Sequence, residues 1–165
     1  MSNESAYARA GVDIEAGERA VDLMKAHVAA TRRPEVLGGL GGFAGFFDAS
    51  VLGQYRHPVL ATSTDGVGTK VAIAQAMDIH DTIGFDLVGM LVDDLVVVGA
   101  EPWFVTDYIA CGHVDPDRIA AVVKGIAAAC TQAGCSLLGG ETAEHPGLLT
   151  DDEYDDEGAT TGPVE

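Results

Sequence analysis

A short segment of this sequence combines a carboxylate, two glycines, a threonine and a lysine. Its residues are Asp65, Gly66, Gly68, Thr69 and Lys70, between an expected strand and an expected helix. Glycine amides and helix-start amides can bind phosphate, and a lysine adds positive charge. Because Asp65 alone repels phosphate, we expect Mg²⁺ between the carboxylate and a bound nucleotide. The segment is not a Walker A loop, and a plain surface turn remains the competing interpretation.

Two adjacent carboxylates, Asp93 and Asp94, interrupt the apolar stretch 81–99, which we expect to form a largely buried helix. Ionised carboxylates are costly to bury unless they are paired or bind a metal ion. The stretch contains no lysine or arginine, so we expect at least one of the two to contact a metal ion or nucleotide. Asp86 lies seven residues before Asp93 and shares its helix face. A solvated helix face is the competing interpretation.

A third carboxylate, Glu141, follows Gly139-Gly140 at the end of an expected short strand, 136–138. Because glycine lets a backbone approach a ligand closely, Gly140 is a candidate binding residue. Glu141 is then a candidate third oxygen ligand for the same cation. A simple turn after the strand is the competing interpretation.

The segment 38–45 contains five glycines, which predicts an irregular loop. Its glycines resemble a dinucleotide-binding motif, but Arg32-Arg33-Pro34 precede them where that motif needs a strand. A flexible, amide-rich cover over phosphate remains an interpretation of this loop.

The remaining pattern predicts one α+β domain over residues 1–165. Besides the elements above, we expect helices over 16–30 and 70–77 and from Pro116 onward, and strands over 59–64, 103–111 and 159–165. The acidic run 151–157 is expected to be a solvated loop. The chain stops inside an expected strand, which is typical of truncation before a further domain.

Composition excludes several classes of partner. The formal net charge of −17 argues against nucleic acid and anionic membranes, which need a basic surface. Aspartates break the longest apolar stretch, 83–100, so it cannot span a membrane. The N-terminus has no secretory signal. The cysteines Cys111, Cys130 and Cys135 are odd in number and lack CxxC spacing, which favours reduced thiols in the cytoplasm.

Several segments, taken in order, resemble one family. They are AGVDIEAG (10–17), TRRPEVLGGLGGFAGFF (31–47), STDGVGTKVAIA (63–74), HDTIGFDLVGMLVDDLVVVGAEPWFVTDYIA (80–110) and AGCSLLGGETAEHPG (133–147). Together they are similar to the N-terminal domain of the AIR synthetases, the phosphoribosylformylglycinamidine cyclo-ligases. One departure is Ala8-Arg9, where family members often carry Lys-Asp.

The resemblance implies a fold and a reaction. The fold is a mixed or antiparallel sheet with helices on one face, which completes a barrel across a homodimer, followed by a C-terminal α/β domain. The reaction uses ATP and Mg²⁺ to close formylglycinamidine ribonucleotide into aminoimidazole ribonucleotide. Alternatives are the ATP-binding domain of a relative, such as thiamine-monophosphate kinase or selenophosphate synthetase, and a non-catalytic dimerisation fragment.

The resemblance also assigns roles to residues. It implies Asp65, Asp94 and Glu141 as metal ligands, and Asp65, Lys70 and Asp94 as catalytic residues. The expected nucleotide contacts are Gly39, Gly41, Gly42, Gly66, Gly68, Thr69, Lys70 and Gly140.

Overall fold

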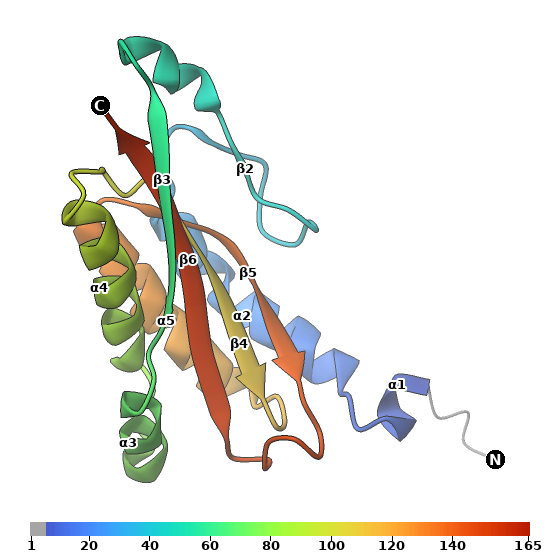
Figure 1. The fold of residues 1–165 in the computed structure, drawn as a ribbon. Helices are drawn as coiled ribbons and strands as arrows, with labels where there is room; N and C mark the ends of the chain where they lie inside the picture. The colour runs from blue at the N-terminus through green and yellow to red at the C-terminus, as the bar shows by residue number, and fades with distance from the viewer. Residues whose placement is uncertain (1–5) are drawn as a thin grey trace.

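A mixed four-stranded sheet, covered by helices on one face, forms the body of the computed structural model, which describes residues 6–165 (Figure 1). The strand order is β3 (Val59–Gly66), β6 (Tyr154–Val164), β4 (Phe104–Cys111) and β5 (Ser136–Glu144). β6 is antiparallel to both of its neighbours, whereas β4 and β5 are parallel. The predicted α+β class and one-sided arrangement of helices are confirmed.

The helices begin and end largely where the sequence predicts. They are α1 (Ala6–Arg9), α2 (Ile14–Ala30), α3 (Lys70–Met77), α4 (Ile83–Val96) and α5 (Pro116–Ala133). Asp13 caps α2 by accepting a hydrogen bond from Ala16 N, and Asp115 caps α5 in the same way. α4 is shorter than 81–99, because residues 97–99 form a turn that ends at Gly99 with φ of 80°.

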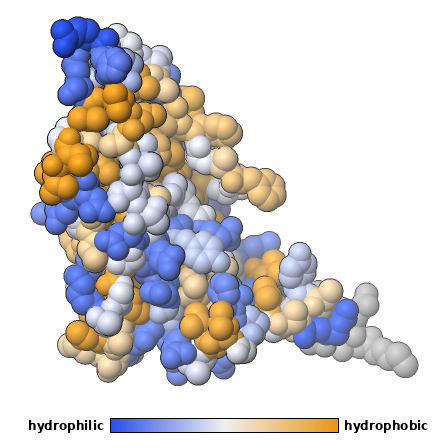
Figure 2. Space-filling model, in the orientation of Figure 1, coloured by the Kyte–Doolittle hydropathy of each residue, from blue (hydrophilic) through white to orange (hydrophobic). Residues whose placement is uncertain are grey.

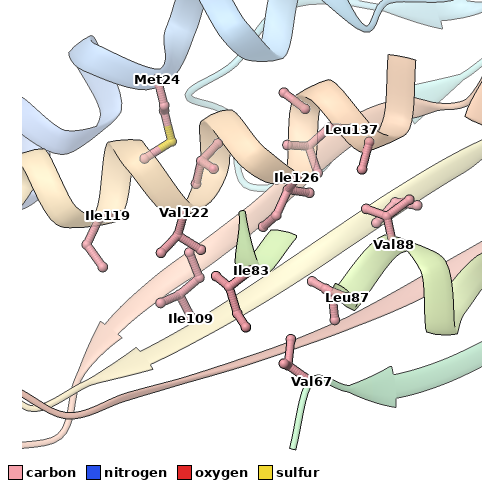
Figure 3. Close-up of a cluster of buried hydrophobic side chains, with 14 of the residues drawn as sticks. Met24, Val67, Ile83, Leu87, Val88, Ile109, Ile119, Val122, Ile126 and Leu137 are labelled. Atoms are coloured by element: carbon pink, nitrogen blue, oxygen red, sulfur yellow. The ribbon is translucent and has the colours of Figure 1, made fainter. Parts of the chain in front are cut away.

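The core lies between the helices and the sheet, where α4 packs on β3 and β6, and α2 and α5 pack on β5 (Figure 3). Its most deeply buried members are Leu87, Leu91, Val105, Ile109, Ile119, Val122 and Ile126. α4 and α5 meet where each carries a glycine. A Cβ added to Gly84 would lie 2.1 Å from the backbone nitrogen of Ile126, so only glycine fits there.

A smaller unit connects α2 to β3. It consists of β1 (Val36–Leu37), β2 (Phe46–Phe47) and the 3-10 helix η1 (Ala49–Gln54). The glycine-rich segment forms the predicted irregular loop between β1 and β2. Phe47 stacks on Trp103, with ring centroids 5.3 Å apart, and so holds this unit against the start of β4.

Three strands are longer than predicted, and the added residues include candidate site residues. Asp65 and Gly66 belong to β3, and Gly139 to Glu144 belong to β5. The acidic run is only partly a loop, because residues 154–157 open β6. The interpretation of Gly139-Gly140 as a turn, and of 151–157 as a solvated loop throughout, is therefore wrong.

Glycine explains this error, since it can mark a turn or a place where a sheet has no room for a side chain. A Cβ on Gly158 would lie 2.8 Å from Leu91 Cδ1, and one on Gly140 would lie 1.7 Å from Asp107 Oδ1. These glycines relieve contacts inside the sheet.

The three cysteines are buried and form no disulfide. Across residues 6–165, none of the helices combines the length and apolar content that a membrane crossing requires.

Candidate functional site

The turn from β3 to α3 holds the first group of predicted site residues. Asp65 Oδ1 accepts a hydrogen bond from Gly66 N at 2.8 Å. Gly68 adopts φ of 69°, so the turn uses the backbone freedom of glycine, and Thr69 precedes α3 without capping it through its side chain. The amides of Val71 and Ala72 donate to Gly68 O and Thr69 O, so those of Thr69 and Lys70 are the ones left for an anion.

Lys70, at the start of α3, is paired with Asp86 of α4, with Nζ and Oδ1 2.6 Å apart. The side chains are 47% and 38% exposed, so water screens the pair. Exposed pairs contribute about 0–1 kcal/mol to stability, so a phosphate could compete for the ammonium at small cost. The stretch 81–99 contains no lysine or arginine, and the basic partner of Asp86 comes from another helix.

Asp93 and Asp94 are both exposed, on the side of α4 that faces away from the core. The prediction that at least one of them suffers a burial cost is therefore wrong. Asp94 is nevertheless held in place, because Ser63 Oγ of β3 donates a hydrogen bond to its Oδ2 at 2.5 Å. Asp65 and Asp94 thus belong to one region, where β3 and α4 meet.

Glu141 lies at the opposite edge of the sheet. Asp65 is aligned with Gly158, Gly158 with Asp107, and Asp107 with Gly140, the residue before Glu141. Three interstrand spacings therefore separate β3 from β5, which is about 14 Å. Within the described part of the chain, no three acidic, histidine or cysteine side chains form a potential metal site. One chain alone does not bring Asp65, Asp94 and Glu141 to a common cation.

A cavity of about 720 Å³ lies beside this second edge, between α2, the glycine-rich loop and β5. Four predicted site residues line it, namely Gly41, Gly42, Gly140 and Glu141. Gly39 lines a smaller cavity of about 230 Å³ nearby. The sequence-based site residues therefore fall into two groups, one at the β3–α3 turn and one around this cavity.

Asp107 lines the larger cavity from β4, and the sequence analysis did not identify it. Burial raises the pKa of this carboxyl group to about 7. Its Oδ1 occupies the space that a side chain at residue 140 would fill, so Gly140 makes room for Asp107. A single aspartate among the apolar residues of the strand 103–111 was the available sequence signal.

Asp156 of β6 is a fully buried carboxyl group near the half-buried Asp107. It has no exposed surface, and among residues 6–165 neither of its oxygens has a hydrogen-bond partner. Burial, followed by the negative charge of Asp107, raises its pKa to about 8. Asp156 alternates with Tyr154 and Gly158 on the helix-covered face of β6, a period of two that a strand assignment would have revealed.

Comparison with known proteins places the chain in a family. The model of the AIR synthase related protein, N-terminal domain, matches residues 47–163. The chain is 61% identical over 160 residues to the phosphoribosylformylglycinamidine cyclo-ligase of Geobacillus kaustophilus (strain HTA426). The aligned residues cover 97% of this chain and 46% of the relative. It is 58% identical over 159 residues to the enzyme of that name from Oceanobacillus iheyensis, covering 96% and 47%. The chain thus spans about half the length of these relatives.

Solved structures share the fold at low sequence identity. The thiamine-monophosphate kinase of Stenotrophomonas maltophilia K279a has a TM-score of 0.64 and 21% identity, covering 88% of this chain and 42% of the kinase. The hydrogenase maturation protein HypE of E. coli has a TM-score of 0.63 and 20% identity, covering 86% and 41%. The fold and the family model agree, and the chain belongs to the AIR synthase related family, whose N-terminal domain it contains.

Proposed function

We propose that this chain is the ATP-binding part of a phosphoribosylformylglycinamidine cyclo-ligase, which closes formylglycinamidine ribonucleotide into aminoimidazole ribonucleotide. The observation that carries the proposal is the 61% identity to a cyclo-ligase over 97% of this chain. The solved structures share only the fold, so they do not favour a kinase over a ligase.

The β3–α3 turn is the proposed site of Mg·ATP. The amides of Gly68 and Thr69 bind phosphate oxygens, and Lys70 exchanges Asp86 for phosphate. This exchange is supported by the exposure of the Lys70–Asp86 pair. Neutralising phosphate charge in this way is what phosphoryl transfer requires of a protein.

The cation of this site is proposed to bind through Asp65 and Asp94. Carboxylate oxygens together with nucleotide phosphates are the usual ligands of Mg²⁺. Ser63 supports the role of Asp94, because its hydroxyl group fixes the carboxylate beside β3. When bound, Mg²⁺ would neutralise the triphosphate that Asp65 otherwise repels.

A homodimer is proposed to complete the site. The sheet face opposite the helices is uncovered (Figure 1 and Figure 2). Leu60 of β3 and Tyr108 of β4 have exposed side chains. Two sheets closed into a barrel would cover this face and join the free edge strands β3 and β5. If β5 of one copy meets β3 of the other, the partner's Glu141 approaches Asp65, which a single chain does not achieve.

The test is a complementation assay. This chain would be assayed alone and fused to the C-terminal half of the Geobacillus kaustophilus relative, with formylglycinamidine ribonucleotide and Mg·ATP. We expect ADP and aminoimidazole ribonucleotide from the fusion. Asp94→Asn should lower the rate about tenfold or more, because it removes a charged ligand. Asp93→Asn, its exposed neighbour, is the control. A fusion that phosphorylates thiamine monophosphate and does not close the ring would contradict the proposal.

A further inference from the structure

The large cavity has a charge that is unusual for a nucleotide site. Four carboxylates line it, from Glu18, Asp22, Asp107 and Glu141, against one ammonium group, that of Lys25. Lys25 is already paired with Asp22, with Nζ and Oδ1 2.5 Å apart. The remaining lining is negative, so it repels phosphate and favours a cation or a group rich in hydrogen-bond donors.

Asp107 is a half-buried acceptor in the lining of this cavity. In the described part of the chain, no other residue donates a hydrogen bond to its carboxyl group, which contacts only its own backbone amide. It lies beside Gly139 and Gly140, where no side chain stands between the carboxyl group and the cavity. A donor supplied by a ligand could bind the acceptor sites of this carboxyl group that its own amide leaves open, and a charged donor would bind most strongly.

We propose that Asp107 binds the amidine group of the cyclo-ligase substrate, at the inner end of the cavity between α2, the glycine-rich loop and β5. This inference rests on the proposed function, and it names a residue and a chemical group that determine specificity. An amidine is protonated at neutral pH and presents two N–H donors in one plane. A carboxylate can accept both, as it does from the guanidinium group of arginine.

Asp156 strengthens this arrangement from the adjacent strand. It is buried beside Asp107, and neither of its oxygens has a hydrogen-bond partner among residues 6–165. A bound amidinium would place a positive charge against this pair. The volume of about 720 Å³ is in the usual range for a small-molecule site. The phosphate expected near Gly41 and Gly42 would then lie at the mouth of the cavity, away from Asp107.

A pair of matched ligands tests the inference. Formylglycinamidine ribonucleotide and formylglycinamide ribonucleotide differ only in whether the amidine nitrogen is replaced by oxygen. Each would be titrated into the 165-residue chain by calorimetry, with Asp107→Asn as the variant and Asp117→Asn, an exposed aspartate of α5, as the control. We expect the wild type and the control to prefer the amidine by about tenfold or more, because a charge-assisted hydrogen bond is lost with the amide. Asp107→Asn should lose this preference. Equal binding of the two ligands by the wild type, or an unchanged preference in Asp107→Asn, would overturn the inference.

A second measurement does not depend on the stability of the variant. Backbone amide shifts of the wild-type chain would be followed by NMR as the amidine ligand is added. We expect the largest changes at Asp107 and at residues 139–142, and an absence of changes there overturns the inference. A parallel titration with Mg·ATP separates the two proposals. Normal Mg·ATP binding without an amidine preference refutes only the role of Asp107, whereas absent Mg·ATP binding counts against the proposed function.

Discussion

Replacing Asp156 by asparagine should stabilise this protein, and more so as the pH rises. Asp156 is fully buried, and neither oxygen has a partner among residues 6–165. Burial, and then the charges of Asp107, Asp155 and Glu157, raise its pKa from 3.8 to about 8. The folded protein therefore holds a proton that the unfolded chain releases above about pH 4. Folding stability should fall as the pH rises from about 4 to about 8, and then level off.

The size of this effect follows from the pKa. A rise from 3.8 to about 8 corresponds to an upper limit of about 6 kcal/mol at pH 8.5, and about 2 kcal/mol at pH 5. A typical domain has only about 5–15 kcal/mol of stability, so the effect should be large. Asparagine cannot ionise, so the variant loses the contribution of residue 156 to the pH dependence of stability. The separate contribution of Asp107 remains.

The assay is urea unfolding at pH 5 and pH 8.5, with Asp151→Asn, an exposed carboxylate in the turn before β6, as the control. We expect Asp156→Asn to gain several kcal/mol over the wild type at pH 8.5 and much less at pH 5. The control should follow the wild type at both pH values. The reasoning about this carboxyl group is refuted if Asp156→Asn is less stable than the wild type at pH 8.5. It is also refuted if the variant loses as much stability between pH 5 and pH 8.5 as the wild type does.

Further predictions concern helix packing and the nucleotide site. Gly84→Ala should destabilise the protein by about 3 kcal/mol, because the added Cβ would lie 2.1 Å from Ile126 N. Gly89→Ala on the same helix places its Cβ in open space, so it should be neutral or stabilising by up to about 1 kcal/mol. Thermal unfolding of both variants measures the difference. Lys70→Met should change stability by less than about 1 kcal/mol, since the pair with Asp86 is exposed, yet weaken Mg·ATP binding about tenfold, as calorimetry would show. Equal losses from both glycine variants, or unchanged nucleotide binding in Lys70→Met, would count against these assignments.

The helices could be predicted from the sequence because their signals are local. The apolar stripes repeat at helical spacing, and Asp13 and Asp115 lie where the caps belong. The strands were predicted too short, because a glycine inside a sheet and a glycine in a turn look alike in a sequence. Gly140 and Gly158 show the difference only when Asp107 and Leu91 are seen beside them.

The candidate site was predictable only in part, for a similar reason. The β3–α3 turn is a local feature, and the sequence identifies its residues. The separation of Asp65 from Glu141 depends on the strand order β3-β6-β4-β5, in which the last strand of the chain pairs between two earlier ones. Such non-local pairing is invisible in a list of motifs. Asp156 was overlooked because acidic runs are usually solvated, whereas here a strand turns every second residue toward the core.

The most direct test of the account is titration of the 165-residue chain with ATP, in the presence of Mg²⁺ and after its removal by a chelator. The account predicts binding that depends on Mg²⁺, together with NMR shift changes at residues 65–70. Binding that persists without the metal, or shift changes confined to other parts of the chain, would contradict the assignment of the β3–α3 turn as the Mg·ATP site.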